Sequence, residues 1–151
     1  MRSRSKTRSG LTLVELVVVL MILAILVAIA APRAFETSRT AKDNSARYSL
    51  SVIRSAIDQY SAAHNGALPG ADGTEATFVS DLRGYIRGGD LPNCPVGGAG
   101  SNDVYILAGA EAPGANSAVG THSWAYNYQT GDFHVNSPEL SSDDATTYDQ
   151  F

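Results

Sequence analysis

The residues best suited to chemistry are one carboxylate and the glycine that precedes it. Glu15 follows Gly10, Leu11 and Thr12 and lies in an otherwise apolar run. A carboxylate surrounded by lipid is costly unless it finds a positive partner. If the chain were cut after Gly10, the new ammonium group of Leu11 would lie about one helical turn from Glu15, on the same chain or on a neighbour. The alternative is a capping box, T-x-x-E, in which Thr12 and Glu15 bond the free N–H groups at the start of a helix.

Other side chains that could act in catalysis are few. The histidines are His64, His122 and His134, and the sequence contains no H-E-x-x-H, G-x-S-x-G or P-loop motif. We therefore expect no enzymatic activity, with His64 near a helix end and the other two histidines at strand edges. Cys94 is the single cysteine, so the chain cannot form an internal disulfide, and we expect a small packed thiol.

The charges are divided unequally along the 151 residues. Residues 1–64 contain nine Lys or Arg and four Asp or Glu, whereas residues 65–151 contain two and eleven, respectively. The later part therefore has the wrong sign for binding phosphates. We expect no nucleic-acid partner.

The first 32 residues have the pattern of a membrane anchor. Residues 1–10 carry four cations and no acid, which is typical of a targeting segment. Residues 11–31 are interrupted only by Thr12 and Glu15, and as a helix they would span about 31 Å, the thickness of a bilayer core. The eleven Leu, Ile and Val residues between Leu16 and Ala31 outweigh the cost of Glu15 near one end. We therefore expect a basic leader over residues 1–10 and a transmembrane anchor over residues 11–32, instead of a cleaved secretory signal or an amphipathic presequence.

The helix is expected to continue beyond the anchor in amphipathic form over residues 33–65. Pro32 should bend it without ending it. An apolar stripe then recurs at helical spacing, comprising Ala46, Leu50, Ile53, Ile57 and Tyr60. Asn65-Gly66 is a favourable helix stop.

Two pairs of opposite charge on this helix are expected to lie in solvent. Asp43 with Arg47, and Arg54 with Asp58, are spaced i,i+4. Such exposed pairs lie on the solvent-facing side of the helix and do not form a functional site.

Residues 66–151 are predicted to form a small head. A Gly- and Pro-rich loop with a short helix near residues 78–87 precedes three candidate strands, 103–107, 123–128 and 132–136. We expect an antiparallel sheet of about three strands with one face covered by the apolar stripe of the long helix. The expected fold class is α+β.

The segment Gly10-Leu11-Thr12-Leu13-Val14-Glu15, with its basic leader and long apolar helix, resembles the class III signal of type IV pilins and type II secretion pseudopilins. The resemblance implies a pilin-like fold, cleavage after Gly10 by a prepilin peptidase, N-methylation of Leu11, and a role for Glu15 in subunit registration within a filament. Pro32 lies where such proteins often have a kink. Leu11 departs from the phenylalanine that is more common in the family.

The compact head and the lack of a second cysteine are closer to a pseudopilin than to a type IV pilin. The resemblance then implies a structural subunit of a type II secretion pseudopilus that helps to drive protein export. It would be a single-pass protein of the bacterial inner membrane with its head in the periplasm. Its partners would be prepilin peptidase, other pseudopilin subunits, the inner-membrane assembly platform and membrane lipid. One alternative is a type IV pilin for adhesion, motility or DNA uptake; another is a membrane-tethered binding or enzymatic domain.

The acidic end of the chain allows two interpretations. The carboxylates of Glu139, Asp143, Asp144 and Asp149 could bind calcium, as acidic head loops do in major pseudopilins. However, no EF-hand spacing is present, and a solvated, mobile terminus explains the same residues. We therefore expect no cofactor.

Overall fold

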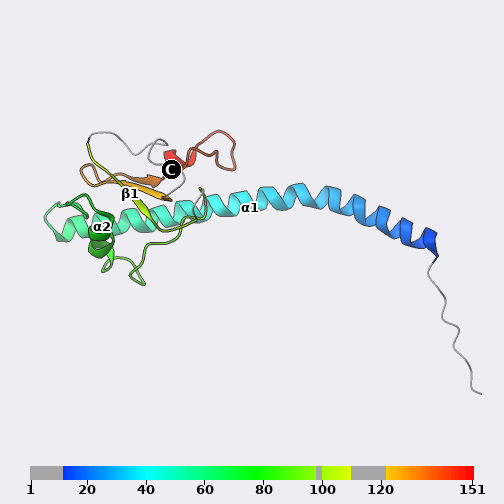
Figure 1. Cartoon of the computed structure of the whole chain (residues 1–151), viewed down its shortest axis with the longest axis horizontal. Coiled ribbons are helices and arrows are strands. Elements are labelled where there is room, and N and C mark those ends of the chain that lie inside the picture. Colours follow the sequence, from blue (N-terminus) through cyan, green and yellow to red (C-terminus); the bar gives the residue numbers. More distant parts are fainter. Residues whose placement is uncertain (1–11, 98–99, 110–121) are drawn as a thin grey trace, which may run out of the picture. The chain divides into compact units, whose positions relative to one another are not determined.

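The computed structural model describes residues 12–97, 100–109 and 122–151. The chain forms two compact units, Met1–Thr37 and Ser38–Phe151. The elements in chain order are helix α1 (Leu13–Ala63), helix α2 (Glu75–Leu82), strands β1 (Val104–Leu107), β2 (Trp124–Asn127) and β3 (Phe133–Val135), and the 3-10 helix η1 (Tyr148–Gln150) (Figure 1). The α+β, pilin-like prediction of a long first helix and a small sheet is confirmed.

Helix α1 begins and ends close to the predicted residues. It continues through Pro32, as expected, and the predicted kink at this residue stays a prediction. At the end of the helix, Asn65 and Gly66 adopt φ angles of 56° and 89°, and the N–H of Gly66 donates to the carbonyl of Ser61 over 2.8 Å. This left-handed turn closes the helix because glycine accepts such a φ angle without strain.

The apolar stripe of α1 is part of the core of the second unit. Ala46, Leu50, Ile53 and Ile57 are at most 4 % exposed. They share one hydrophobic cluster with Phe78 and Leu82 of α2 and with the side chains of the sheet. The predicted cover of the sheet by this helix is therefore confirmed.

The sheet has the order β1-β2-β3 and is mixed. Strands β2 and β3 pair antiparallel, with Trp124 opposite Val135 and Tyr126 opposite Phe133. Strands β1 and β2 pair parallel, with Val104 opposite Trp124, so the prediction of a wholly antiparallel sheet was wrong. The connection over residues 108–123 is long enough for the crossover that a parallel pair requires, whereas the short connection from β2 to β3 permits only a hairpin.

Aromatic side chains on the sheet fill the core. Trp124, Tyr126 and Phe133 are at most 1 % exposed, and the ring of Phe78 lies 4.2 Å from that of Tyr126, centroid to centroid. The indole N–H of Trp124 donates to the carbonyl of Pro92 and the Tyr126 hydroxyl donates to that of Pro69, both over 3.1 Å. The buried polar ends of these aromatic residues are therefore hydrogen-bonded, as burial requires.

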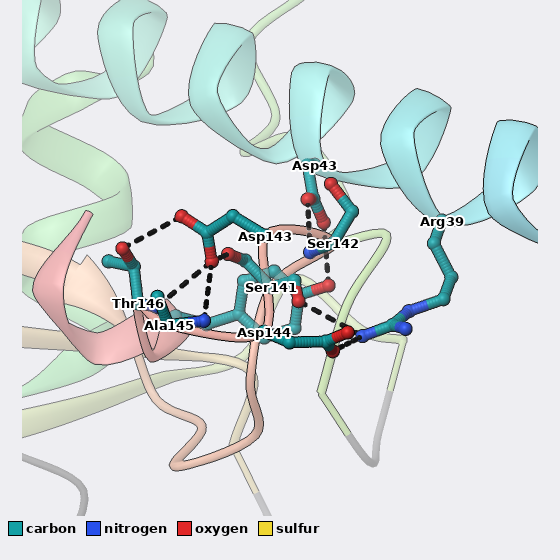
Figure 2. A network of polar contacts seen from close by, with 9 residues as sticks. Arg39, Asp43, Ser141, Ser142, Asp143, Asp144, Ala145 and Thr146 are labelled. Carbon is teal, nitrogen blue, oxygen red and sulfur yellow. Dashed lines mark hydrogen bonds and ion pairs between the residues drawn. The ribbon is translucent and has the colours of Figure 1, made fainter.

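Two of the charged residues expected in solvent instead hold the end of the chain against α1. Arg54 donates from Nε and Nη2 to the carbonyl of Phe133 and from Nη2 to that of Phe151. Asp43 is 5 % exposed, and its carboxylate accepts from the N–H of Ser142 over 2.7 Å (Figure 2). It also accepts from the hydroxyl of Tyr148 over 2.6 Å. Spacing along the helix did not reveal these contacts because their partners lie far away in the sequence.

Replacing Ile53 by alanine tests the packing of the stripe. Because Ile53 is fully buried, Ile53→Ala should lower the free energy of unfolding by about 2 to 5 kcal/mol. The measurement is chemical denaturation of the full chain in detergent, followed by the fluorescence of Trp124, the single tryptophan. The control Ser51→Ala changes an exposed residue of the same helix and should unfold like the wild type. Equal decreases in the free energy of unfolding in Ile53→Ala and Ser51→Ala would contradict this packing.

The buried Asp43 carboxylate should make stability depend on pH. Burial opposes its ionisation, but hydrogen bonds from Ser142 and Tyr148 outweigh this effect and lower the pKa of Asp43. Its stabilisation is therefore complete above the unfolded pKa of about 4 and is lost as the pH falls through the folded pKa. At neutral pH, Asp43→Asn should lower the free energy of unfolding by about 1.5 to 3 kcal/mol. The difference in unfolding free energy between the variant and the wild type should become smaller in acid. The measurement is the unfolding free energy of both proteins between pH 7 and pH 2.5. A difference that stays constant over this range would contradict the role assigned to the Asp43 carboxylate.

Candidate functional site

The first unit presents an apolar helical surface to its surroundings. The large apolar side chains from Leu13 to Ile29 are 44 to 79 % exposed. A helix of this length and composition is able to cross a membrane, and none of its most apolar window is buried within the protein. An exposed apolar surface of this kind is typical of a helix that contacts lipid or other apolar helices.

The start of α1 positions Glu15. The hydroxyl of Thr12 accepts from the N–H of Glu15 over 3.2 Å, and the carbonyl of Thr12 accepts from the N–H of Leu16 over the same distance. Thr12 is thus the N-terminal cap of α1, and Glu15 lies exposed in the first turn. This contact is the threonine half of the capping box. It does not exclude the second role predicted for the carboxylate, since the hydrogen bond uses only the backbone of Glu15.

The other predicted processing and assembly residues lie at or before this helix start. Gly10 and Leu11, together with the leader over residues 1–10, lie outside the described residues. Pro32 lies within α1. The structure therefore brings Thr12 and Glu15 together, and the proposed cleavage position directly precedes them in the sequence.

The titratable groups that were weighed as catalytic residues have structural surroundings. His64 stacks on Tyr60 at the end of α1, with ring centroids 4.0 Å apart. Burial, together with the nearby Arg54, lowers the pKa of His134 and so favours the neutral form of its ring. Cys94 is 1 % exposed, and burial raises the pKa of its thiol to about 11, so it stays protonated and unreactive.

The acidic segment near the end of the chain is folded, unlike the mobile terminus expected, although Glu139, Asp143 and Asp144 are exposed to solvent as expected. Leu140 pairs with Thr147 in an isolated antiparallel bridge, and η1 follows. Tyr148 and Phe151 are buried at 5 % and 8 % exposure. The guanidinium of Arg47 lies 3.5 Å from the centroid of the Phe151 ring, a cation–π contact.

Within this segment, Asp143 closes a tight turn. Its Oδ1 atom accepts from the hydroxyl of Ser141 over 2.6 Å and from the N–H groups of Ala145 and Thr146 over 3.0 and 2.9 Å, and its Oδ2 atom accepts from the Thr146 hydroxyl over 2.9 Å (Figure 2). These hydrogen bonds, that from Ser141 first, hold the pKa of Asp143 well below its usual range.

Arg39 of α1 connects this turn to the helix. Its Nη2 atom donates to the carbonyl of Ser141 over 3.0 Å and to Oδ1 of Asp144 over 2.8 Å. Figure 2 shows the side chain reaching from the helix to both partners. Sequence reasoning missed Arg39 because its partners follow it by more than a hundred residues and no local spacing connects them.

The acidic side chains of this segment have different partners in the described structure and do not converge on one point. In the part of the chain that the structure describes, no three His, Cys, Asp or Glu side chains are placed to bind one ion. Asp43, Asp143 and Asp144 each accept from a different set of protein donors. Calcium requires six to eight oxygen atoms that converge on one point.

Comparison with known proteins supports the interpretation of the N-terminal segment. The family model described as the prokaryotic N-terminal methylation motif matches residues 5–31. The type II secretion system core protein G of Pseudomonas aeruginosa is 31 % identical over 114 residues, which cover 72 % of this chain and 80 % of that relative. No solved structure matches the chain significantly.

The similarity to core protein G is too long to be confined to the anchor, since 114 aligned residues must include part of the head. The alignment therefore covers both features of the structure. These are the exposed apolar start of α1 and the small head packed on the later part of α1. The chain belongs to the type II secretion pseudopilins, structural subunits without enzymatic activity that carry a prepilin-type N-terminal methylation motif.

Proposed function

We propose that this chain is a pseudopilus subunit that is cleaved after Gly10 by a prepilin peptidase, N-methylated on Leu11 and assembled through α1 into a filament that drives protein export. The observation that carries the proposal is the position of Glu15, which lies in the first turn of α1 inside the matched methylation motif. Similarity to a type II secretion core protein favours this role over that of a type IV pilin.

The proposed role of Glu15 follows from the cost of a charge in lipid. At the centre of a bilayer, an unpaired charged side chain costs about 2.5 to 3.5 kcal/mol on the insertion scale. Cleavage after Gly10 creates an ammonium group on Leu11, and methylation preserves its positive charge. Pairing of this ammonium with Glu15 of a neighbouring subunit would place adjacent helices in register.

The proposed location is the bacterial inner membrane, with one span and the head in the periplasm. The exposed apolar side chains of the first unit support the span. Four closely spaced cations, Arg2, Arg4, Lys6 and Arg8, precede it and favour a cytoplasmic amino terminus. The proposed partners are prepilin peptidase, other pseudopilin subunits, the inner-membrane assembly platform and lipid.

The proposed work of the filament is mechanical. Each added subunit would move from lipid into contact with the α1 helices of its neighbours and displace the earlier subunits outward. The apolar surface of the first unit supports this transfer, because it is equally compatible with lipid and with other apolar helices.

Processing can be tested at the scissile glycine. Co-expression with a prepilin peptidase should yield a chain that begins with N-methylated Leu11, observed by mass spectrometry of membranes. Gly10→Leu should leave most of the chain uncleaved because the added side chain prevents close approach of the backbone. The neighbouring change Ser9→Ala should leave processing unchanged. Recovery of wild-type protein that still begins with Met1 would exclude the processed-subunit proposal.

The charge of Glu15 can be separated from its capping role with glutamine. Glu15→Gln keeps the size of the side chain and its ability to complete a capping box, but removes the charge. We expect normal membrane insertion and at least a tenfold decrease in incorporation into sheared filaments, measured by quantitative immunoblotting. Thr12→Ala is the matched control that removes the observed cap and retains the carboxylate. Normal incorporation of Glu15→Gln would leave Glu15 with the capping role alone.

A further inference from the structure

We propose that the turn at residues 141–147 is closed by Arg39 of α1 in place of a bound calcium ion, so that this head folds equally well with and without calcium. The proposal concerns the folded head alone and does not depend on cleavage or filament assembly. It distinguishes the acidic segment of this chain from the calcium-binding head loops that its sequence resembles in composition.

The first argument is the direction of the hydrogen atoms around Asp143. Both carboxylate oxygens accept from protein donors, and three of these bonds reach Oδ1 alone. The donors are N–H and O–H groups whose hydrogen atoms point at the carboxylate. A carboxylate has about four acceptor sites, so these four hydrogen bonds leave Asp143 little capacity to bind a calcium ion in this conformation.

The second argument is that the turn already has a cation. The guanidinium of Arg39 bonds one backbone carbonyl, that of Ser141, and one carboxylate, that of Asp144. Carbonyl and carboxylate oxygens are the ligand types that calcium selects in proteins. A planar guanidinium with donors in fixed directions satisfies both oxygens from a single side chain and without dehydrating an ion.

The third argument is that the carboxylate facing the turn from α1 is also engaged. Asp43 is buried, and its two oxygens accept from Ser142 and Tyr148. Recruiting Asp43 to a metal would therefore break two short hydrogen bonds and leave the N–H of Ser142 and the hydroxyl of Tyr148 without this acceptor. Asp43 is therefore not available as a calcium ligand for the turn.

The contribution of Arg39 should be modest because the ion pair is largely in water. The side chains of Arg39 and Asp144 are 47 % and 69 % exposed, and exposed pairs are strongly screened. The hydrogen bond to the Ser141 carbonyl is less sensitive to salt. We therefore expect loss of Arg39 to shift the unfolding temperature by a few degrees without unfolding the head.

The test is thermal unfolding of the full chain in detergent micelles, followed by the fluorescence of Trp124. The chain is compared in EGTA, in about 5 mM calcium, which exceeds the dissociation constants of weak extracellular calcium modules, and in equal magnesium at matched ionic strength. We expect the three midpoints to agree within about 1 °C. A larger rise that is specific to calcium and reversed by EGTA would overturn the proposal, as would saturable calcium binding below millimolar concentration in a calorimetric titration.

Variants of Arg39 test the second half of the proposal. Arg39→Gln should lower the midpoint by about 2 to 5 °C, equally in EGTA and in calcium, and Arg39→Lys should lose less because it keeps the charge. Lys42→Gln removes an exposed cation one turn away and should leave the midpoint unchanged. If Arg39→Gln unfolds at the same temperature as Lys42→Gln, Arg39 does not close the turn.

Discussion

The burial of one apolar stripe of α1 against the sheet is the contact on which the folded head depends. Three strands of three or four residues cannot cover their own apolar face. Ile53 and its neighbours supply the missing layer, and Trp124 and Phe133 pack in the same cluster. The head therefore includes the later part of α1.

Local patterns were sufficient to predict the long helix and the positions of the three strands, but they placed the short helix a few residues late, at 78–87 instead of Glu75–Leu82, and missed η1 and the contacts between distant parts of the chain. Apolar periodicity predicted α1, and Asn65-Gly66 predicted its end, because both signals act within a few residues. The direction of β1 depends on the route of a long connection, which alternation of side chains does not encode. Asp43 and Arg54 were assigned to solvent for a similar reason, since the segment that covers them follows about a hundred residues later.

The carboxylates of the folded head and the carboxylate of Glu15 differ in the partners available to them. Asp43 and Asp143 are satisfied by N–H and O–H donors, and Asp144 by the guanidinium of Arg39. Glu15 differs because it lies at the start of a helix whose side chains require lipid or other helices. The partner proposed for it is the ammonium of Leu11, which proteolysis creates. In the proposed filament, assembly would therefore depend on Glu15 and Leu11, and not on the charges that hold the head together.

The most direct measurement is a filament structure by electron cryomicroscopy at a resolution that shows side chains. The account predicts that each subunit begins at Leu11 and that its amino nitrogen lies within about 4 Å, salt-bridge distance, of a Glu15 carboxylate. Density for residues 1–10 on assembled subunits, or a Glu15 carboxylate that faces away from every Leu11 nitrogen, would contradict it.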